Sequence, residues 1–158
     1  MKLYVYDHCP FCVRARMIFG LKNLPVELVV LANDDEATPI GLVGKKVVPI
    51  LVKEEGTAMP ESLDIVHYVD EHFGEKILSE HVRPEIEAWL KEVGSYYGHL
   101  TTARFTQIGL AEFETQSAVD YFTKKKTEFI GDFAENIAKT ETYLARLKGD
   151  LEKLAGLI

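Results

Sequence analysis

The chain has 158 residues, 47% of them hydrophobic, which is enough to build a packed core without disulfide or metal staples. Its 25 acidic and 18 basic side chains give a formal net charge of −7, which excludes the basic surface that nucleic acids and anionic membranes require. The only two cysteines share one tetrapeptide, and the longest apolar runs are too short to cross a bilayer, so a disulfide-stapled secreted domain and a membrane-spanning chain are excluded.

The first quarter of the chain predicts a strand, a helix and a second strand. Residues 2–6 alternate around buried positions as in a short strand. From Pro10 the apolar residues follow the helical period, and residues 23–25 end that pattern. Residues 26–31 form a continuous apolar run, which is typical of a strand covered on both faces. The predicted order is therefore βαβ.

Two further strands and a helix are predicted next. Residues 47–52 indicate a buried strand with Pro49 near its end, and residues 57–59 indicate a short strand that follows a hairpin turn. Ser62 is placed to cap a helix of regular apolar period. The order βαβ then ββα predicts an α/β domain with a four-stranded mixed sheet over residues 1–78.

The sequence beyond this domain predicts helices only. One amphipathic helix begins at Pro84, a favoured first-turn residue. A second apolar stripe covers residues 130–158 with spacings of three, four and seven residues, and Gly149 is the expected break in it. The stripe fits a coiled coil or a core-facing helix of a small bundle, and the bundle is the commoner origin. We therefore expect an all-α domain over residues 84–158.

The motif Cys9-Pro10-Phe11-Cys12 lies where the first predicted strand gives way to the first predicted helix. Pro10 fits the first helical position, so Cys9 falls at the N-cap, where the helix dipole favours its thiolate. Cys12 lies one turn further, where β-carbons are roughly 5–6 Å apart and a disulfide is within reach. The pair predicts dithiol redox chemistry, with Cys9 as nucleophile and Cys12 as resolving thiol.

A C-x-x-C pair is also half of a zinc site, and inert thiols are a third interpretation. Structural zinc requires four ligands, and the chain has no second cysteine pair. No metal-ligand spacing is present among His67, His72, His81 and His99. Asp7 is interpreted as a turn residue. The basic side chains expected to assist Cys9 are Arg14, Arg16 and Lys22.

Five segments carry a family pattern: YDHCPFC at 6–12, ARM at 15–17, VPIL at 48–51, MPES at 59–62 and DIVHY at 64–68. In these segments the sequence resembles the bacterial glutaredoxin 2 family, closely up to about residue 73 and more loosely in the helical remainder. The resemblance implies a thioredoxin-like N-terminal domain followed by an all-α, glutathione-transferase-like C-terminal domain. It also implies a glutathione-dependent thiol-disulfide oxidoreductase.

The resemblance further implies a glutathione site. Val48 would pair its backbone with the cysteinyl part of glutathione beside a cis-Pro49, whereas the sequence alone predicts a trans bond there. Glu61 and Ser62 would receive the γ-glutamyl end, and the alternative for Ser62 is a plain helix cap. The complete set is Cys9, Pro10, Phe11, Val48, Pro49, Glu61 and Ser62. We expect glutathione as co-substrate, no metal or prosthetic group, disulfide-bonded or glutathionylated proteins as partners, and a cytoplasmic location.

Two departures from the family pattern keep alternatives open. Phe11 stands where the family usually has tyrosine, and C-P-F also occurs in omega-type glutathione transferases and dehydroascorbate reductases, which usually lack the second cysteine. The chain ends at Ile158, earlier than the family's helical domain normally ends, so we expect that domain to be incomplete. A non-catalytic scaffold that binds a partner is the alternative of another class, but it leaves the dithiol unexplained. The sequence leaves the oligomeric state open.

Overall fold

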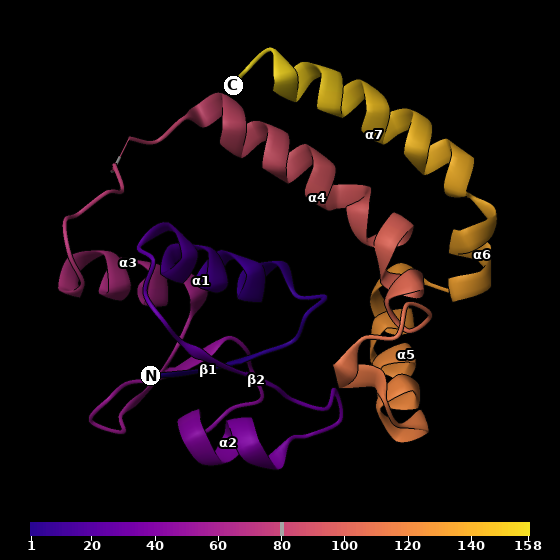
Figure 1. Ribbon diagram of the computed structural model, residues 1–158. Helices are drawn as coiled ribbons and strands as arrows, with labels where there is room; N and C mark the ends of the chain where they lie inside the picture. The colour runs from indigo at the N-terminus through magenta and orange to yellow at the C-terminus, as the bar shows by residue number, and fades with distance from the viewer. Residues whose placement is uncertain (80) are drawn as a thin grey trace. The chain divides into compact units, whose positions relative to one another are not determined.

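The computed structural model describes residues 1–79 and 81–158, which divide into two compact units (Figure 1). Unit 1 comprises Met1–Ser79 together with Leu110–Val119. Unit 2 comprises residues 81–109 and 120–158. A short segment from the second half of the chain therefore belongs to the unit that the first half builds.

A four-stranded sheet with the strand order β2-β1-β3-β4 forms the centre of unit 1. Its first strand, β1 (Lys2–Val5), is parallel to β2 (Glu27–Val30) and antiparallel to β3 (Ile50–Val52). The last strand, β4 (Ala58–Pro60), is antiparallel to β3. The predicted four-stranded mixed sheet is confirmed.

Helices lie on both faces of this sheet (Figure 1). On one face α1 (Pro10–Leu21) packs against α3 (Ser62–His72), and both were predicted. On the opposite face lies α2 (Ala37–Val43), which was not predicted. It has only 7 residues and contains Pro39 and Gly41, so its apolar period is too short to indicate a helix. The element order is βαβαββα rather than βαβ followed by ββα.

The core of unit 1 lies between the sheet and the α1–α3 layer. Alternation along β1 buries Leu3 and Val5 completely, as the sequence predicts. β2 differs from the prediction, because it is an edge strand and Leu28 is 43% exposed rather than covered on both faces. The buried residues of this core are Leu3, Val5, Cys12, Ala15, Ile18, Phe19, Leu51, Ile65, Val66 and Val69.

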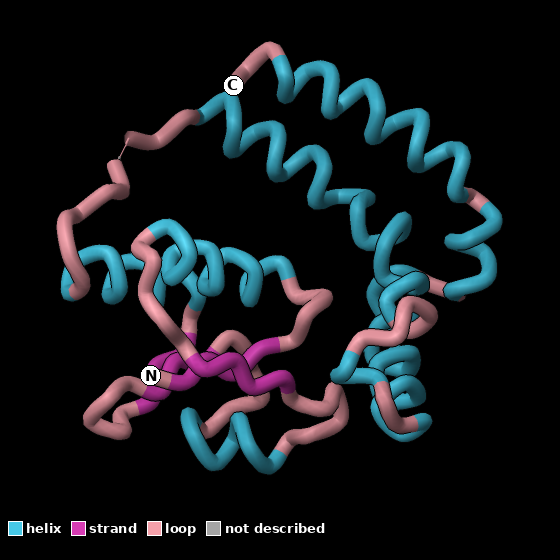
Figure 2. Tube along the Cα trace, viewed as in Figure 1, coloured by secondary structure: helices cyan, strands magenta, loops and turns pink. Residues whose placement is uncertain are grey.

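Helices and connecting loops make up the described residues of unit 2 (Figure 2). The long helix α4 (Pro84–Phe105) packs against α6 (Phe133–Ala138) and α7 (Thr140–Ala155). The chain between α4 and α6 contains a short 3₁₀ helix, η1 (Ala111–Phe113), and then α5 (Gln116–Ile130); η1 and the first four residues of α5 belong to unit 1. The packing of α7 along α4 confirms the bundle interpretation of the C-terminal apolar stripe.

The stripe over residues 130–158 is divided among three helices instead of forming one. Gly131, with φ of 75°, follows the end of α5, and Lys139 separates α6 from α7. The break expected at Gly149 is wrong, because α7 continues through this position. The apolar spacing therefore continues across two helix ends and does not reveal either of them.

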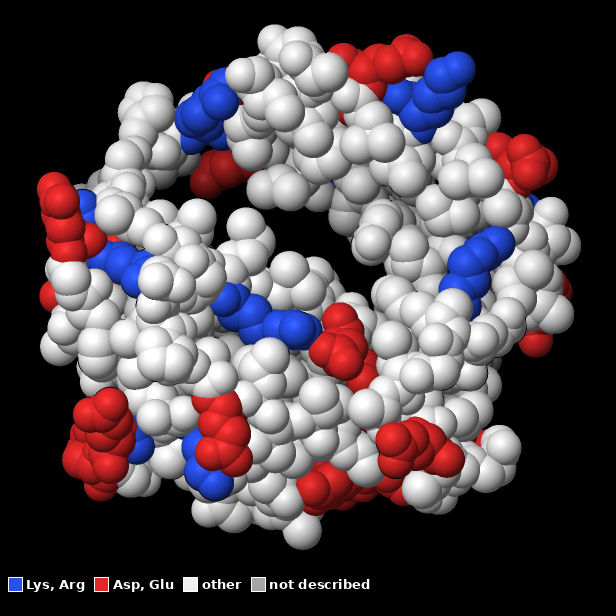
Figure 3. Space-filling model, in the orientation of Figure 1, with Lys and Arg blue, Asp and Glu red and all other residues white. Residues whose placement is uncertain are grey.

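Acidic and basic side chains are interspersed on the face shown in Figure 3, with Asp and Glu in several groups and Lys and Arg between them. Among the described residues, no helix combines the length and apolar character needed to cross a membrane. The same residues contain no group of three or more His, Cys, Asp or Glu side chains arranged to hold a metal ion.

Candidate active site

Cys9 occupies the N-cap of α1, as the sequence predicts. Its backbone is extended, with φ of −82° and ψ of 118°, and Pro10 takes the first helical turn. The Cys9 carbonyl accepts the N–H of Val13 at 3.0 Å, which is the first hydrogen bond of the helix. The Cys9 sulfur therefore lies at the positive end of the helix dipole.

The two thiols have opposite electrostatic environments. Both are free, with Cys9 half-buried and Cys12 fully buried. A hydrogen bond from the Cys12 side chain lowers the pKa of Cys9 to about 6, against the effect of burial and with help from neighbouring backbone N–H groups and His8. The same hydrogen bond, together with burial, raises the pKa of Cys12. These pKa values predict a Cys9 thiolate beside a Cys12 thiol at neutral pH.

Arg14 connects the cysteine motif with the start of α3. Its guanidinium lies over the ring of Phe11, 5.5 Å from the ring centroid, and its Nη1 is 3.5 Å from the Ser62 hydroxyl oxygen. Phe11 is 53% exposed, whereas Ser62 is buried. Two parts of the glutathione site that the family resemblance implied are thus brought together by one cationic side chain.

The other basic side chains have separate partners. Arg16 Nη1 forms an ion pair with Asp7 at 2.7 Å, so Asp7 does more than form a turn. Lys22 was expected to assist Cys9, but this is wrong, because it is the C-cap of α1, at the opposite end of the helix. It forms a buried ion pair with Asp70 of α3 at 2.7 Å and thereby fastens α1 to α3.

The Val48–Pro49 peptide bond is cis. This is the isomer that the family resemblance implied and the opposite of the isomer that the sequence alone predicts. Pro49 is buried and directly precedes β3. Val48 is half-buried and packs, like Cys9, against the core of unit 1.

Glu61 and Ser62 form the start of α3 in a way that the sequence did not predict. Ser62 is the first residue of the helix rather than its cap, and Glu61 takes the N-cap position without a side-chain capping bond. The Glu61 backbone has φ of 74°, a conformation that costs about 1–3 kcal/mol in non-glycine residues and is concentrated at functional sites. Its exposed carboxylate pairs with Lys45 at 2.8 Å.

Sequence reasoning missed one pair of residues at the site. The Glu112 Oε1 atom lies 2.7 Å from His8 Nδ1 and accepts the His8 backbone N–H at 3.0 Å. His8 directly precedes Cys9, and this adjacency is the signal that the sequence offers. Nothing in the sequence links it to a glutamate 104 positions away.

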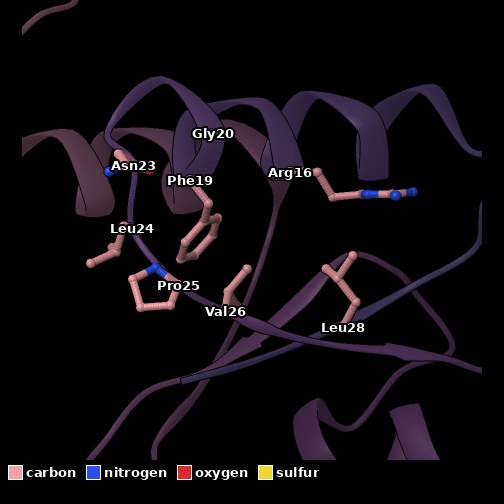
Figure 4. Close-up of a pocket in the computed structure, with 8 residues that line it drawn as sticks. All are labelled: Arg16, Phe19, Gly20, Asn23, Leu24, Pro25, Val26 and Leu28. Carbon is pink, nitrogen blue, oxygen red and sulfur yellow. The ribbon is translucent and has the colours of Figure 1, made fainter.

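A separate pocket of about 390 Å³ lies between α1 and β2 (Figure 4). The Phe19 ring points from α1 toward Pro25 and Val26, while Arg16 extends along the helix. The pocket includes neither cysteine nor any of the predicted glutathione-binding residues, so we assign it no part in the site. Its lining consists of Arg16, Phe19, Gly20, Asn23, Leu24, Pro25, Val26 and Leu28.

Known families match both halves of the chain. Residues 3–77 match the family described as the glutathione S-transferase N-terminal domain, and residues 85–158 match the glutaredoxin 2 C-terminal domain. Over its full length the chain is 49% identical to glutaredoxin 2 of Escherichia coli K12, and the match covers 74% of that protein. The chain belongs to the glutaredoxin 2 family.

Solved structures agree with this membership of the glutaredoxin 2 family. The crystal structure of glutaredoxin 2 from Salmonella typhimurium in complex with glutathione has a TM-score of 0.96 and 50% identity, covering 99% of this chain and 72% of that one. A glutathione transferase from Phanerochaete chrysosporium has a TM-score of 0.67 at 14% identity, covering 96% and 72%, which indicates a common fold alone. The predicted family and the predicted fold class are confirmed.

Proposed function

We propose that this glutaredoxin 2 family member is a glutathione-dependent thiol-disulfide oxidoreductase that acts on protein disulfides and on glutathione mixed disulfides. The observation that carries this proposal is the Cys9 thiolate at the N-cap of α1, beside the buried thiol of Cys12. A thiolate is the species that attacks a disulfide, and a neighbouring thiol allows the product to be resolved. The Salmonella relative, crystallised with glutathione, supports the choice of reductant.

Reduction of a glutathione mixed disulfide needs Cys9 alone. The Cys9 thiolate attacks the glutathione sulfur of the mixed disulfide, forms a Cys9–glutathione disulfide and releases the protein thiolate, which takes a proton from water. A second glutathione, as its thiolate, attacks the glutathione sulfur of that disulfide. Oxidised glutathione leaves, and the Cys9 thiolate is restored with its original charge.

Reduction of a protein disulfide needs both cysteines. Cys9 attacks one sulfur of the substrate disulfide and becomes joined to the protein, while the other substrate sulfur leaves as a thiolate and takes a proton. Cys12 then loses its proton, attacks the Cys9 sulfur and releases the second substrate thiol. The resulting Cys9–Cys12 disulfide is reduced by two glutathione molecules, which supply the two electrons and leave as oxidised glutathione.

We propose that glutathione binds across the N-terminal ends of α1 and α3. The backbone of Val48 is suited to pair with the backbone of the cysteinyl residue, because the loop before β3 packs on the same core as Cys9. The first-turn N–H groups of α3 lack intrahelical partners and suit the γ-glutamyl carboxylate. The proposed contacts are Cys9, Pro10, Phe11, Val48, Pro49, Glu61 and Ser62.

Disulfide-bonded or glutathionylated proteins are the proposed partners, and the cytoplasm is the proposed compartment. Reduced glutathione keeps thiols reduced there, which is the condition that this reaction requires. The formal net charge of −7 argues against nucleic acids and anionic membrane surfaces as partners.

The test is a glutathione-coupled reductase assay on three proteins: the wild type, Cys9→Ser and Cys12→Ser. We expect Cys9→Ser to lose activity on both substrate classes, because it removes the nucleophile. Cys12→Ser should keep activity on glutathione mixed disulfides and lose activity on protein disulfides, because only the second reaction needs a resolving thiol.

Two outcomes would contradict this proposal. Disulfide reductase activity that survives in Cys9→Ser would remove Cys9 from the role of nucleophile. Conjugating or dehydroascorbate reductase activity that survives loss of Cys12 and exceeds disulfide reduction would instead indicate an omega-type transferase or a dehydroascorbate reductase.

A further inference from the structure

The residue before the nucleophile is held by a buried carboxylate from the second half of the chain. Glu112 Oε1 binds both the backbone N–H and the Nδ1 atom of His8, at 3.0 and 2.7 Å. The exposed fraction of the side chain is 10% for His8 and 0% for Glu112. The His8 ring is stacked against Tyr6 and Phe113, with centroid distances of 5.5 and 5.3 Å. These contacts fix the position and orientation of the ring in the residue that directly precedes Cys9.

The geometry also sets where the His8 proton lies. An ionised carboxylate only accepts hydrogen bonds, so Nδ1 of His8 carries the proton that Glu112 receives. Burial opposes ionisation of Glu112, but hydrogen bonds from the His8 ring, from the His8 backbone N–H and from its own backbone N–H together outweigh this effect and lower the pKa of Glu112. The second carboxylate oxygen of Glu112 has no hydrogen-bond partner among the described residues.

We propose that Glu112 is a positioning residue for the nucleophile: it holds the ring of His8, the residue directly before Cys9, in one orientation with a proton on Nδ1, and the ring held in this way favours the Cys9 thiolate. This inference rests on the proposed function, because it takes Cys9 as the reacting thiol. A positive ring beside a thiolate stabilises it. The pKa of Cys9 agrees, since after the larger contributions of Cys12, burial and backbone N–H groups it is also lowered by the charge of His8.

The charged groups on the segments next to His8 and Glu112 have partners that a substitution of Glu112 leaves in place. Toward α1, Arg16 is paired with Asp7. Lys46, between α2 and β3, donates to the carbonyl of Asn33 on the loop after β2, and the N–H of Asn33 donates to the Glu112 carbonyl at 2.9 Å. Asp34, the residue after Asn33, accepts a hydrogen bond from the Ser117 hydroxyl.

The test measures the rate at which iodoacetamide alkylates the reduced protein as a function of pH. Glu112→Gln keeps the size of the side chain and an acceptor oxygen for His8, but removes the charge. We expect the pKa of Cys9 to rise by about 0.5–1 unit, which makes alkylation near pH 6 about two- to five-fold slower. Glu114→Gln, an exposed carboxylate in the same segment, is the matched control and should leave the profile unchanged.

The sign of the shift separates this inference from a direct effect of charge. A carboxylate that acted on Cys9 directly would disfavour the thiolate, so its removal would lower the pKa of Cys9. In a His8→Gln background, Glu112→Gln should produce no further rise, because Glu112 acts through the ring. An unchanged or lowered pKa in the single variant, or an equal rise in the His8→Gln background, would overturn the inference.

A second variant covers the case in which Glu112→Gln does not fold, as judged by near-ultraviolet circular dichroism. His8→Gln alone should then raise the pKa of Cys9, and an unchanged value would overturn the inference. Alkylation needs neither glutathione nor turnover. Failure here is therefore distinguishable from failure of the proposed reductase function, which the coupled assay reports.

Discussion

At the scale of single residues, the pKa of Cys9 depends most on its hydrogen bond with the Cys12 thiol. The hydrogen bond from the Cys12 side chain has the largest effect on the pKa of Cys9 and outweighs the burial that opposes ionisation. Backbone N–H groups at the start of α1 add to it. We therefore propose that Cys12, in addition to its proposed role as resolving thiol, favours the Cys9 thiolate while it is itself protonated.

This hydrogen bond predicts how ionisation of the Cys9 thiol depends on pH. The thiolate is fully formed well above pH 6 and is lost as pH falls through this value, so wild-type alkylation should be half-maximal near the pKa of about 6. Cys12→Ala removes the donor and should raise the pKa of Cys9 by about 1–2 units, toward that of a free thiol. Cys12→Ser retains a hydroxyl donor and should shift it less. Ultraviolet absorbance of the thiolate gives an independent titration of all three proteins.

Identical titration curves for Cys12→Ala and the wild type would contradict this account. In that case the helix N-terminus and the backbone N–H groups would have to stabilise the thiolate by themselves. The relative size of the two pKa shifts is an internal control. A general disturbance of the fold would not make the shift larger for alanine, which has no donor, than for serine, which has one.

How far the site residues could be predicted depends on how local their environment is. Cys9 at the N-cap follows from the proline beside it, so the sequence was sufficient. Ser62 was misplaced by one position, because Glu61 adopts a positive φ where the sequence offers no glycine. Glu112 was beyond reach, because its contact with His8 depends on how the chain returns to unit 1.

At the scale of elements, the end of α5 and the start of α6 are built by two adjacent residues. Gly131 has φ of 75°, which residues with a β-carbon adopt only at a cost. Asp132 is the N-cap of α6, and its Oδ1 accepts the N–H of Glu135 at 2.9 Å. Apolar spacing continues across this junction, so periodicity could not reveal it. The adjacent Gly131 and Asp132 are the local signal for this junction, because glycine often follows the end of a helix and aspartate often caps the start of the next one.

Two glycines in unit 2 should therefore respond oppositely to alanine. At Gly131 a β-carbon has free space but an unfavourable φ, and Gly131→Ala should destabilise the protein by about 1–2 kcal/mol. At Gly149, inside α7, a β-carbon also has free space and the backbone is helical, so Gly149→Ala should stabilise it by about 0.5–1 kcal/mol. Urea unfolding monitored by circular dichroism measures both.

Because neither new methyl group meets a neighbour within 4 Å, the comparison isolates backbone conformation from packing. Equal effects of the two substitutions would contradict the assigned end of α5. Stabilisation by Gly131→Ala would indicate that one helix continues through residue 131, as the uninterrupted stripe predicted.

At the scale of the whole molecule, unit 1 draws on both halves of the chain. Phe113 and Ala118 are buried, and the Ser117 hydroxyl donates to Asp34 at 2.5 Å. Together with the contact between Glu112 and Asn33, these interactions fasten residues 110–119 to the loop after β2. Hydrophobic patterns describe which face of an element is buried, but not which unit buries it. The sequence therefore could not assign this segment.

This arrangement predicts that residues 110–119 lose structure together with unit 1. A substitution of Asp70 can destabilise unit 1 selectively and so test this prediction. The Asp70 carboxylate is buried in unit 1 and accepts the N–H groups of Ile77 and Leu78, at 3.0 and 3.1 Å. Burial alone would raise the pKa of Asp70, but these bonds and the Lys22 ammonium lower it to about 2. The stabilisation is present above the ordinary aspartate pKa of about 4 and is lost as pH falls toward 2.

Asp70→Asn should therefore destabilise unit 1 at neutral pH, because it leaves Lys22 without its buried counter-ion. In hydrogen exchange we expect faster exchange in β1, α1 and residues 110–119, and little change in α4 and α7. Asp150→Asn is the matched control, since Asp150 is buried in unit 2 and accepts the Tyr96 hydroxyl at 2.8 Å. It should give the reverse pattern. If residues 110–119 instead exchanged with α4 and α7, their assignment to unit 1 would be wrong, and with it the link between Glu112 and Cys9.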